Sequence, residues 1–319
     1  MLNKVLIPLD GSANAEKIAG WAEGIAESFD SDFILLMVVD PKKIDRAGEG
    51  AGRDRPARGD HRLDSATGAD ESAVGIAFGG TISTSPTAPN LEELSGYGTQ
   101  LIEQGAQQAN NKVNDVANRL ANRGFKVRAM VTIGTPEEEI LDVAEQQGVD
   151  LITMATHRES LLVRGVLGSV TDRVITHSKL PVLTVRPEDV SETVPVKPDV
   201  VLVPLDGSEI SEAVIPLAST IAAKMGSTLL FVRVSSMAYH SAMGDAGIYY
   251  TSPVSYSRAS DLAGEYLAPF VEQAELAGIS AAMRMPTGSP ASTLTKIADE
   301  NSSPMIVIGT RGQSGFKRL

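Results

Sequence analysis

The sequence predicts an α/β protein built from two copies of one unit, each a parallel sheet with helices on both faces. The stretch from Lys4 to Ser12 returns from Val200 to Ser208, with its Pro, Asp, Gly and Ser in register. Along each copy, apolar runs typical of buried strands alternate with segments whose apolar residues have helical spacing. This alternation implies parallel strands joined by crossover helices.

The spacing between the two copies changes once along the chain. Asp10 and Asp206 lie 196 residues apart, whereas Gly134 and Gly288 lie 154 residues apart. Copy one is therefore longer by the difference, 42 residues, and the extra length falls within about 41–90. This insertion is rich in Gly, Ala, Ser, Asp, Arg and Pro and has few large apolar residues, so we expect it to be mostly disordered.

In copy one we expect five strands and four helices. The expected ranges are 4–9, 13–29, 33–39, 91–123 (one helix, or two with a break near 96–98), 126–131, 136–147, 151–154, 169–177 and 182–185. Thr135 is the predicted N-cap of the helix from Pro136, and Glu138 would complete a capping box. Copy two repeats the order from Val200.

The repeat also predicts the domain boundaries. Domain 1 covers 1–187 with the insertion, 188–198 is a proline-containing acidic linker, and domain 2 covers 199–319. At the 154-residue spacing Leu319 corresponds to Gly165, so we expect domain 2 to lack its last helix and strand. Either the chain is a fragment or the gene is truncated; we expect a fragment, because stopping there leaves a sheet edge unpaired.

Composition excludes several classes of protein. The absence of Cys rules out disulfides and thiol chemistry. A net charge of −12 argues against nucleic-acid and anionic-membrane partners. The longest apolar run, 33–39, is far shorter than the ~20 residues that span a bilayer, so we expect no membrane insertion. The first strand begins by Lys4, which leaves no room for a signal peptide, and we expect a cytoplasmic protein.

Three features predict a phosphate-containing ligand. An acid follows strand one, where the order of strands in an open α/β sheet reverses and ligands bind. Glycines after strand four let backbone N–H groups approach a polyphosphate closely. A Gly-Ser pair, Gly168-Ser169, opens the next helix, and a helix N-terminus favours anions.

With these residues, both copies resemble the universal stress protein family in its tandem form, nearly throughout the chain outside the insertion and linker. The resemblance implies two Rossmann-like domains of the adenine nucleotide alpha hydrolase-like type, each with an open five-stranded parallel sheet. It also implies ATP across the carboxyl ends of strands one and four, held by Gly-x-x-Gly, nine residues, then Gly-Ser or Gly-Thr. Any Mg²⁺ would arrive with the nucleotide.

The resemblance assigns nucleotide-binding positions in both copies. In copy one they are Pro8, Asp10, Val38, His157, Arg158, Gly168, Ser169 and Val170. In copy two they are Pro204, Asp206, Val234, Gly309, Arg311, Gly312 and Ser314. Copy one departs from the motif, because Ala155 and Arg158 replace its first two glycines. Arg158 either blocks the site or makes a charge-assisted contact to phosphate.

Simpler interpretations remain open for several of these residues. Asp10 and Asp206 can each cap the turn that follows, because Asp-Gly is a common turn pair. Gly309 and Gly312 can merely end a strand. His157 can be a solvent-facing loop residue.

The predicted function is binding of an adenine nucleotide in a stress response, without robust catalysis. The sequence contains no P-loop, nucleophile elbow, zinc-protease or kinase motif. We expect the two domains to pair within the chain or the protein to form a homodimer. The main alternative is a regulatory scaffold that binds protein partners and no nucleotide. A slow ATP hydrolase is a weaker alternative.

Overall fold

The computed structural model describes most of both copies, with gaps in their longest loops. The described residues are 2–12, 19–43, 81–84, 96–156, 168–185, 196–235 and 253–310. Residue contacts divide the chain into two compact units. One unit contains 4–18 and 32–188, and the other contains 1–3, 19–31 and 189–319.

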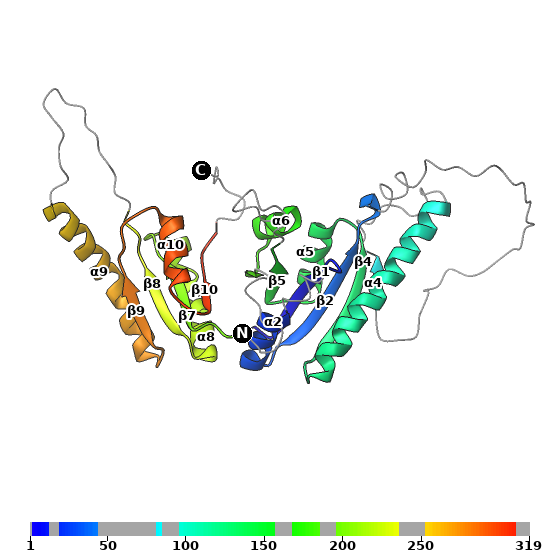
Figure 1. Ribbon diagram of the computed structural model, residues 1–319, viewed down its shortest axis with the longest axis horizontal. Coiled ribbons are helices and arrows are strands. Elements are labelled where there is room, and N and C mark those ends of the chain that lie inside the picture. The colour runs from blue at the N-terminus through cyan, green and yellow to red at the C-terminus, as the bar shows by residue number, and fades with distance from the viewer. Residues whose placement is uncertain are drawn as a thin grey trace, which may run out of the picture. The chain divides into compact units, whose positions relative to one another are not determined.

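The first of these units contains a six-stranded parallel sheet, called sheet A here (Figure 1). In sheet order, its strands are β3 (Thr81–Thr84), β4 (Val127–Ile133), β2 (Asp32–Val39), β1 (Lys4–Leu9), β5 (Leu151–Ala155) and β6 (Val182–Val185). β1 pairs with β2 on one side and with β5 on the other. The chain therefore runs outward from β1 in both directions, and the switch point lies between β1 and β5.

Strand β3 corrects the number of strands that the sequence predicts for copy one. Sheet A contains the five expected strands and this additional one, which pairs in parallel with β4 from Thr81 against Met130 to Thr84 against Ile133. Residues 81–84 belong to the insertion, for which mostly disordered backbone stays a prediction. Their sequence, Thr-Ile-Ser-Thr, has three β-branched residues, which favour extended backbone. Residues 44–80 and 85–90 of the insertion lie outside the described residues.

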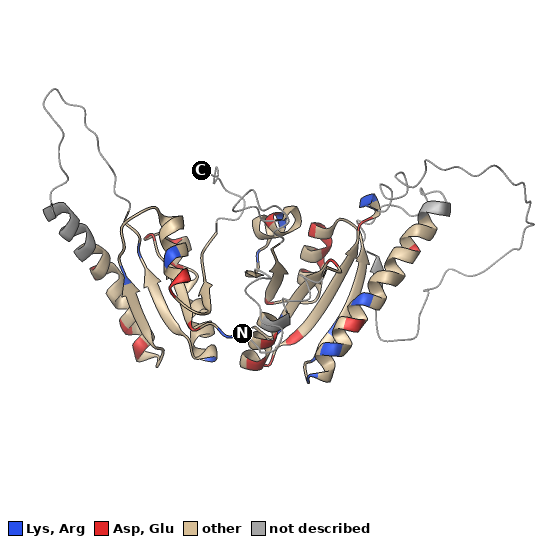
Figure 2. Cartoon of the chain, viewed as in Figure 1, with Lys and Arg blue, Asp and Glu red and all other residues tan. Residues whose placement is uncertain are grey.

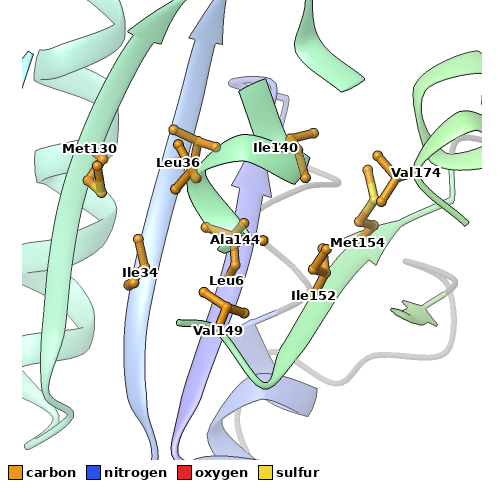
Figure 3. Close-up of a cluster of buried hydrophobic side chains, with 11 residues drawn as sticks. Leu6, Ile34, Leu36, Met130, Ile140, Ala144, Val149, Ile152, Met154 and Val174 are labelled. Atoms are coloured by element: carbon orange, nitrogen blue, oxygen red, sulfur yellow. The ribbon is translucent and has the colours of Figure 1, made fainter. Parts of the chain in front are cut away.

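Helices cover both faces of sheet A (Figure 1). They are α4 (Gly96–Asn122), α5 (Pro136–Gln146) and α6 (Ser169–His177). α4 begins at Gly96, and basic and acidic residues both occur along it (Figure 2); residues 91–95, predicted to begin this helix, lie outside the described residues. α5 and α6 pack on the other face over an aliphatic core (Figure 3) that includes Leu6, Ile34, Ile140, Ile152 and Val174.

The N-termini of α5 in copy one and α7 in copy two differ in how they are capped. Thr135 precedes α5 with extended backbone and Pro136 follows it, as expected, but the Thr135 side chain makes no capping hydrogen bond. The predicted capping box is therefore wrong: the Glu138 side chain is exposed to solvent. In copy two, by contrast, the Ser208 side chain caps its helix by accepting a hydrogen bond from the Ser211 N–H.

The other unit contains a four-stranded parallel sheet, sheet B. In sheet order, its strands are β10 (Pro304–Ile306), β7 (Val200–Pro204), β8 (Thr228–Val232) and β9 (Ala281–Arg284). Its helices are α7 (Glu209–Glu212), α8 (Ile215–Met225), α9 (Pro253–Leu276) and α10 (Pro290–Asp299). The strand order matches β5-β1-β2-β4 of sheet A, so the two copies share one topology.

The same unit also contains α2 (Ala19–Phe29), the helix that follows β1 in sequence. α2 contacts α8, its equivalent in copy two. A Cβ on Gly24 would collide with the carbonyl of Val196, so the backbone of the linker's end lies directly against this helix. Lys197 forms an ion pair with Glu27 at 3.4 Å. Residues 13–18, predicted to begin this helix, and 186–195 of the linker region lie outside the described residues.

Among the described helices, none is both long enough and apolar enough to cross a membrane.

Candidate functional site

The turn after β1 places Asp10 at the switch point of sheet A. The Asp10 carboxylate accepts hydrogen bonds from the backbone N–H of Ser12 at 2.9 Å and from its hydroxyl at 2.6 Å. Gly11 between them has a φ of 77°, which is a left-handed conformation that favours glycine. The carboxylate is thus held by its own turn and remains exposed to solvent.

The N-terminus of α6 lies on the other side of the switch point. Thr171, in the first turn of α6, donates from its hydroxyl to the carbonyl of Ala155 at 3.5 Å, which ties the helix to the end of β5. Gly168 is the N-cap, Ser169 is exposed and Val170 is half-buried. Among the described residues, a Cβ on Gly168 would meet only the Thr171 hydroxyl, at 4.0 Å.

The turn after β7 repeats the arrangement in copy two. The Asp206 carboxylate accepts from the Ser208 N–H at 2.9 Å, and the Asp206 N–H donates to the Ser211 hydroxyl at 3.3 Å. The hydrogen bonds of Ser208 are the largest cause that lowers the pKa of Asp206 to about 2, and that of Ser211 is a further one. The carboxylate is therefore ionised at neutral pH and oriented by the helix start that follows.

Gly309, after β10, has a packing reason to be glycine. A Cβ at this position would collide with the backbone carbonyl of Ile210 in α7. At the 154-residue spacing Gly309 corresponds to Ala155 in copy one, so glycine is kept here and replaced by alanine there.

Some of the remaining predicted site residues lie within the described residues, and others do not. Pro8 and Pro204 are half-buried near the ends of β1 and β7, and Val38 and Val234 pack on the apolar cores of their sheets. His157, Arg158, Arg311, Gly312 and Ser314 lie outside the described residues. Within the described ranges, no group of three His, Cys, Asp or Glu side chains is arranged to hold a metal ion.

The sequence analysis missed a basic side chain beside each aspartate turn. Lys112 from α4 approaches Gly11, and Arg233, directly after β8, approaches Gly207. Arg233 also stacks over the Tyr266 ring, with 4.4 Å between the guanidinium carbon and the ring centroid. The repeat carried a signal for these residues, because Met37 and Arg233 are equivalent at the 196-residue spacing and Lys112 and Tyr266 at the 154-residue spacing.

The fold and the turns define a class: a tandem α/β protein with an aspartate turn at the carboxyl end of a central strand in each copy. A sequence profile of the universal stress protein family matches residues 1–186 and 198–319. The chain belongs to this family, in its two-domain tandem form.

Individual relatives agree with this assignment. The chain is 29% identical over 186 residues to the universal stress protein MJ0577 of Methanocaldococcus jannaschii, covering 58% of this chain and 96% of the relative. It is 25% identical over 186 residues to the universal stress protein YxiE of Bacillus subtilis, covering 58% of this chain and 100% of the relative.

Solved structures resemble the fold over almost the whole chain. A universal stress protein from Archaeoglobus fulgidus has a TM-score of 0.61 at 18% identity, covering 99% of this chain and 88% of that one. PA1789 from Pseudomonas aeruginosa has a TM-score of 0.53 at 14% identity, covering 98% of this chain and 84% of that one. These likenesses establish the fold.

Proposed function

We propose that this universal stress protein binds an adenine nucleotide in copy one, at the switch point between β1 and β5. ATP is the nucleotide we propose. One observation carries the proposal: the Asp10 turn follows β1, and the first turn of α6 is bonded to the end of the neighbouring strand β5. Asp10 would accept a hydrogen bond from the nucleoside. The free N–H groups of the first helical turn would receive the phosphates, with any Mg²⁺ carried by the nucleotide.

The biological part of the proposal rests on the family. We propose a role in a cytoplasmic stress response in which nucleotide occupancy is the signal and turnover is slow or absent. In copy two the Asp206 turn is formed as well, and Gly309, the equivalent of Ala155, packs against the carbonyl of Ile210.

An ATP titration by calorimetry on the full-length chain tests the proposal. Wild type should bind saturably. Gly168→Val should weaken binding at least about tenfold, because its methyl groups would fill the space that the phosphates need. Glu103→Gln, an exposed change on α4, serves as the control and should bind like wild type. The full chain is required because α2 belongs to the unit that contains residues 189–319.

The second candidate function is a regulatory scaffold that binds no nucleotide. Two observations favour it. Each aspartate already accepts hydrogen bonds from its own turn. In addition, Asp172 in the first turn of α6 stabilises that helix N-terminus without any ligand. This candidate predicts that saturating ATP leaves the melting temperature unchanged, whereas the nucleotide-binding proposal predicts an increase.

A further inference from the structure

Two side chains lie directly against the aspartate turn of copy one. A Cβ built on Gly11 would lie 3.2 Å from Nζ of Lys112 and 3.3 Å from Cε of Met37. Lys112 reaches the turn from α4, whereas Met37 is buried in β2. The turn therefore rests on one side chain from the long helix and one from the second strand.

In copy two the equivalent positions are Arg233, which lies against the turn, and Tyr266, which lies behind Arg233. A Cβ built on Gly207 would lie 3.6 and 3.7 Å from the two terminal nitrogens of Arg233. Tyr266 of α9 lies behind the Arg233 guanidinium, at 4.4 Å from its ring centroid. The Tyr266 hydroxyl donates to Glu212 of α7 at 2.6 Å, and Phe270 packs edge-on to its ring at 5.4 Å.

Each pair combines one cation with one large uncharged side chain, but the two roles have changed places. In copy one the helix supplies the cation, Lys112, and the strand supplies Met37. In copy two the strand end supplies the cation, Arg233, and the helix supplies Tyr266. In the described part of the chain, neither cation forms an ion pair with a carboxylate.

We infer that the pairs Met37–Lys112 and Arg233–Tyr266 are positioning residues, which hold the aspartate turn of each copy in place and work only as matched combinations. A cation in both positions would place two like charges in close contact. A cation in neither position would remove the cation–π stack in copy two and leave the turn without its support. The effect on nucleotide affinity rests on the proposed function, whereas the effect on the turn does not.

Transplanting the copy-one pair into copy two tests this inference. The variants are Arg233→Met, Tyr266→Lys and the double substitution, each in the full-length chain. Amide hydrogen exchange of the peptide 204–212 reports the turn, and ATP calorimetry reports the ligand. Each single variant should speed exchange of that peptide about tenfold, and the double variant should return it to within about twofold of wild type. ATP affinity at this site, if present, should follow the same order.

Two controls separate positioning from general destabilisation. Glu272→Gln changes an exposed residue of α9 away from the turn and should exchange like wild type. Exchange of peptides from the core strand β7 should also stay unchanged in all variants. If a single variant unfolds, Tyr266→Phe keeps the ring over Arg233 and removes only the bond to Glu212; it should speed exchange of 204–212 by a smaller factor.

The outcomes separate the two proposals. Wild-type exchange in both single variants, or a double variant with the sum of the two single effects, would overturn the inference. A rescued double variant in a protein that binds no ATP would uphold the inference and refute nucleotide binding. ATP binding, combined with wild-type exchange of the peptide 204–212 in the variants, would uphold nucleotide binding and refute the inference.

Discussion

The fourth strands of the two copies, β5 and β10, carry a similar apolar pattern but differ in how far their side chains are exposed to solvent. Ile152 and Met154 of copy one are 0% and 6% exposed, whereas their equivalents Ile306 and Ile308 are 41% and 58% exposed. In copy one, Val174 of α6 and Val182 of β6 pack against the strand. In sheet B, β10 pairs with β7 and is the edge strand of the described residues. An apolar pattern therefore predicts what a strand is able to bury, and the neighbouring elements decide whether it does.

Substitution at the two isoleucines should give the largest contrast. Ile152→Ala should lower the free energy of unfolding by about 2–5 kcal/mol, because it leaves a cavity in a closed core. Ile306→Ala should cost less than about 1 kcal/mol, because water already reaches the side chain. Urea unfolding followed by circular dichroism measures both. Equal losses would mean that another part of the protein covers β10 in solution.

Two glycines at non-equivalent positions, Gly309 after β10 and Gly168 at the start of α6, differ in their described neighbours. Gly309→Ala should lower stability by about 1–3 kcal/mol, because its Cβ would meet the Ile210 carbonyl and force the backbone to shift. Gly168→Ala has a φ of −56° and, among the described residues, only the Thr171 hydroxyl near its Cβ, so it should leave the melting temperature nearly unchanged. Differential scanning fluorimetry measures both. A clear loss for Gly168→Ala would show that space there is already filled.

The pH dependence of the copy-two turn should follow the lowered pKa of Asp206. The carboxylate accepts hydrogen bonds in the folded state, so its contribution is fully present above its unfolded pKa of about 3.8. The contribution is lost as the pH falls through about 2. In an NMR titration, the amide of Ser208 should shift with a midpoint near pH 2. Asp206→Asn should abolish the transition, and a midpoint near 4 would contradict the hydrogen-bonded turn.

The smallest expected effect concerns Tyr266, the copy-two residue that replaces Lys112. Burial first, and then its bond to Glu212, raise the pKa of the Tyr266 hydroxyl above the ordinary value of 10. Its contribution to stability is therefore present below pH 10 and is lost as the pH rises through the higher folded value. In ultraviolet titrations, Tyr266→Phe and wild type should show the same tyrosinate absorbance at pH 10. A loss of absorbance in the variant would show that the hydroxyl is not held by Glu212.

The sequence predicted the parts of the fold that depend on local pattern. The strands 4–9 and 182–185 and the helix 169–177 have the predicted bounds, because apolar runs between turn residues define them. The repeat correctly predicted two parallel sheets. β3 was missed because a four-residue segment becomes a strand only through its partner, here β4.

For the candidate site, too, the sequence predicted local features and missed contacts between remote segments. Local spacing placed Asp10, Asp206 and Gly168 at strand and helix ends, since each belongs to a turn or cap within a few residues. Lys112 and Arg233 were missed because they reach their turns from elements remote in the sequence. Contacts of this kind depend on how helices lie over the sheet, which the pattern of one segment does not contain.

The placement of α2 has a consequence for how the protein is made. This helix leaves the ribosome early, yet its partner α8 follows 196 residues later at equivalent positions. During synthesis, α2 cannot make its contacts with α8 until that part of the second copy has been translated. Contacts between segments so far apart in the chain also slow folding. Nascent chains that stop before α8 should therefore be the species that chaperones retain.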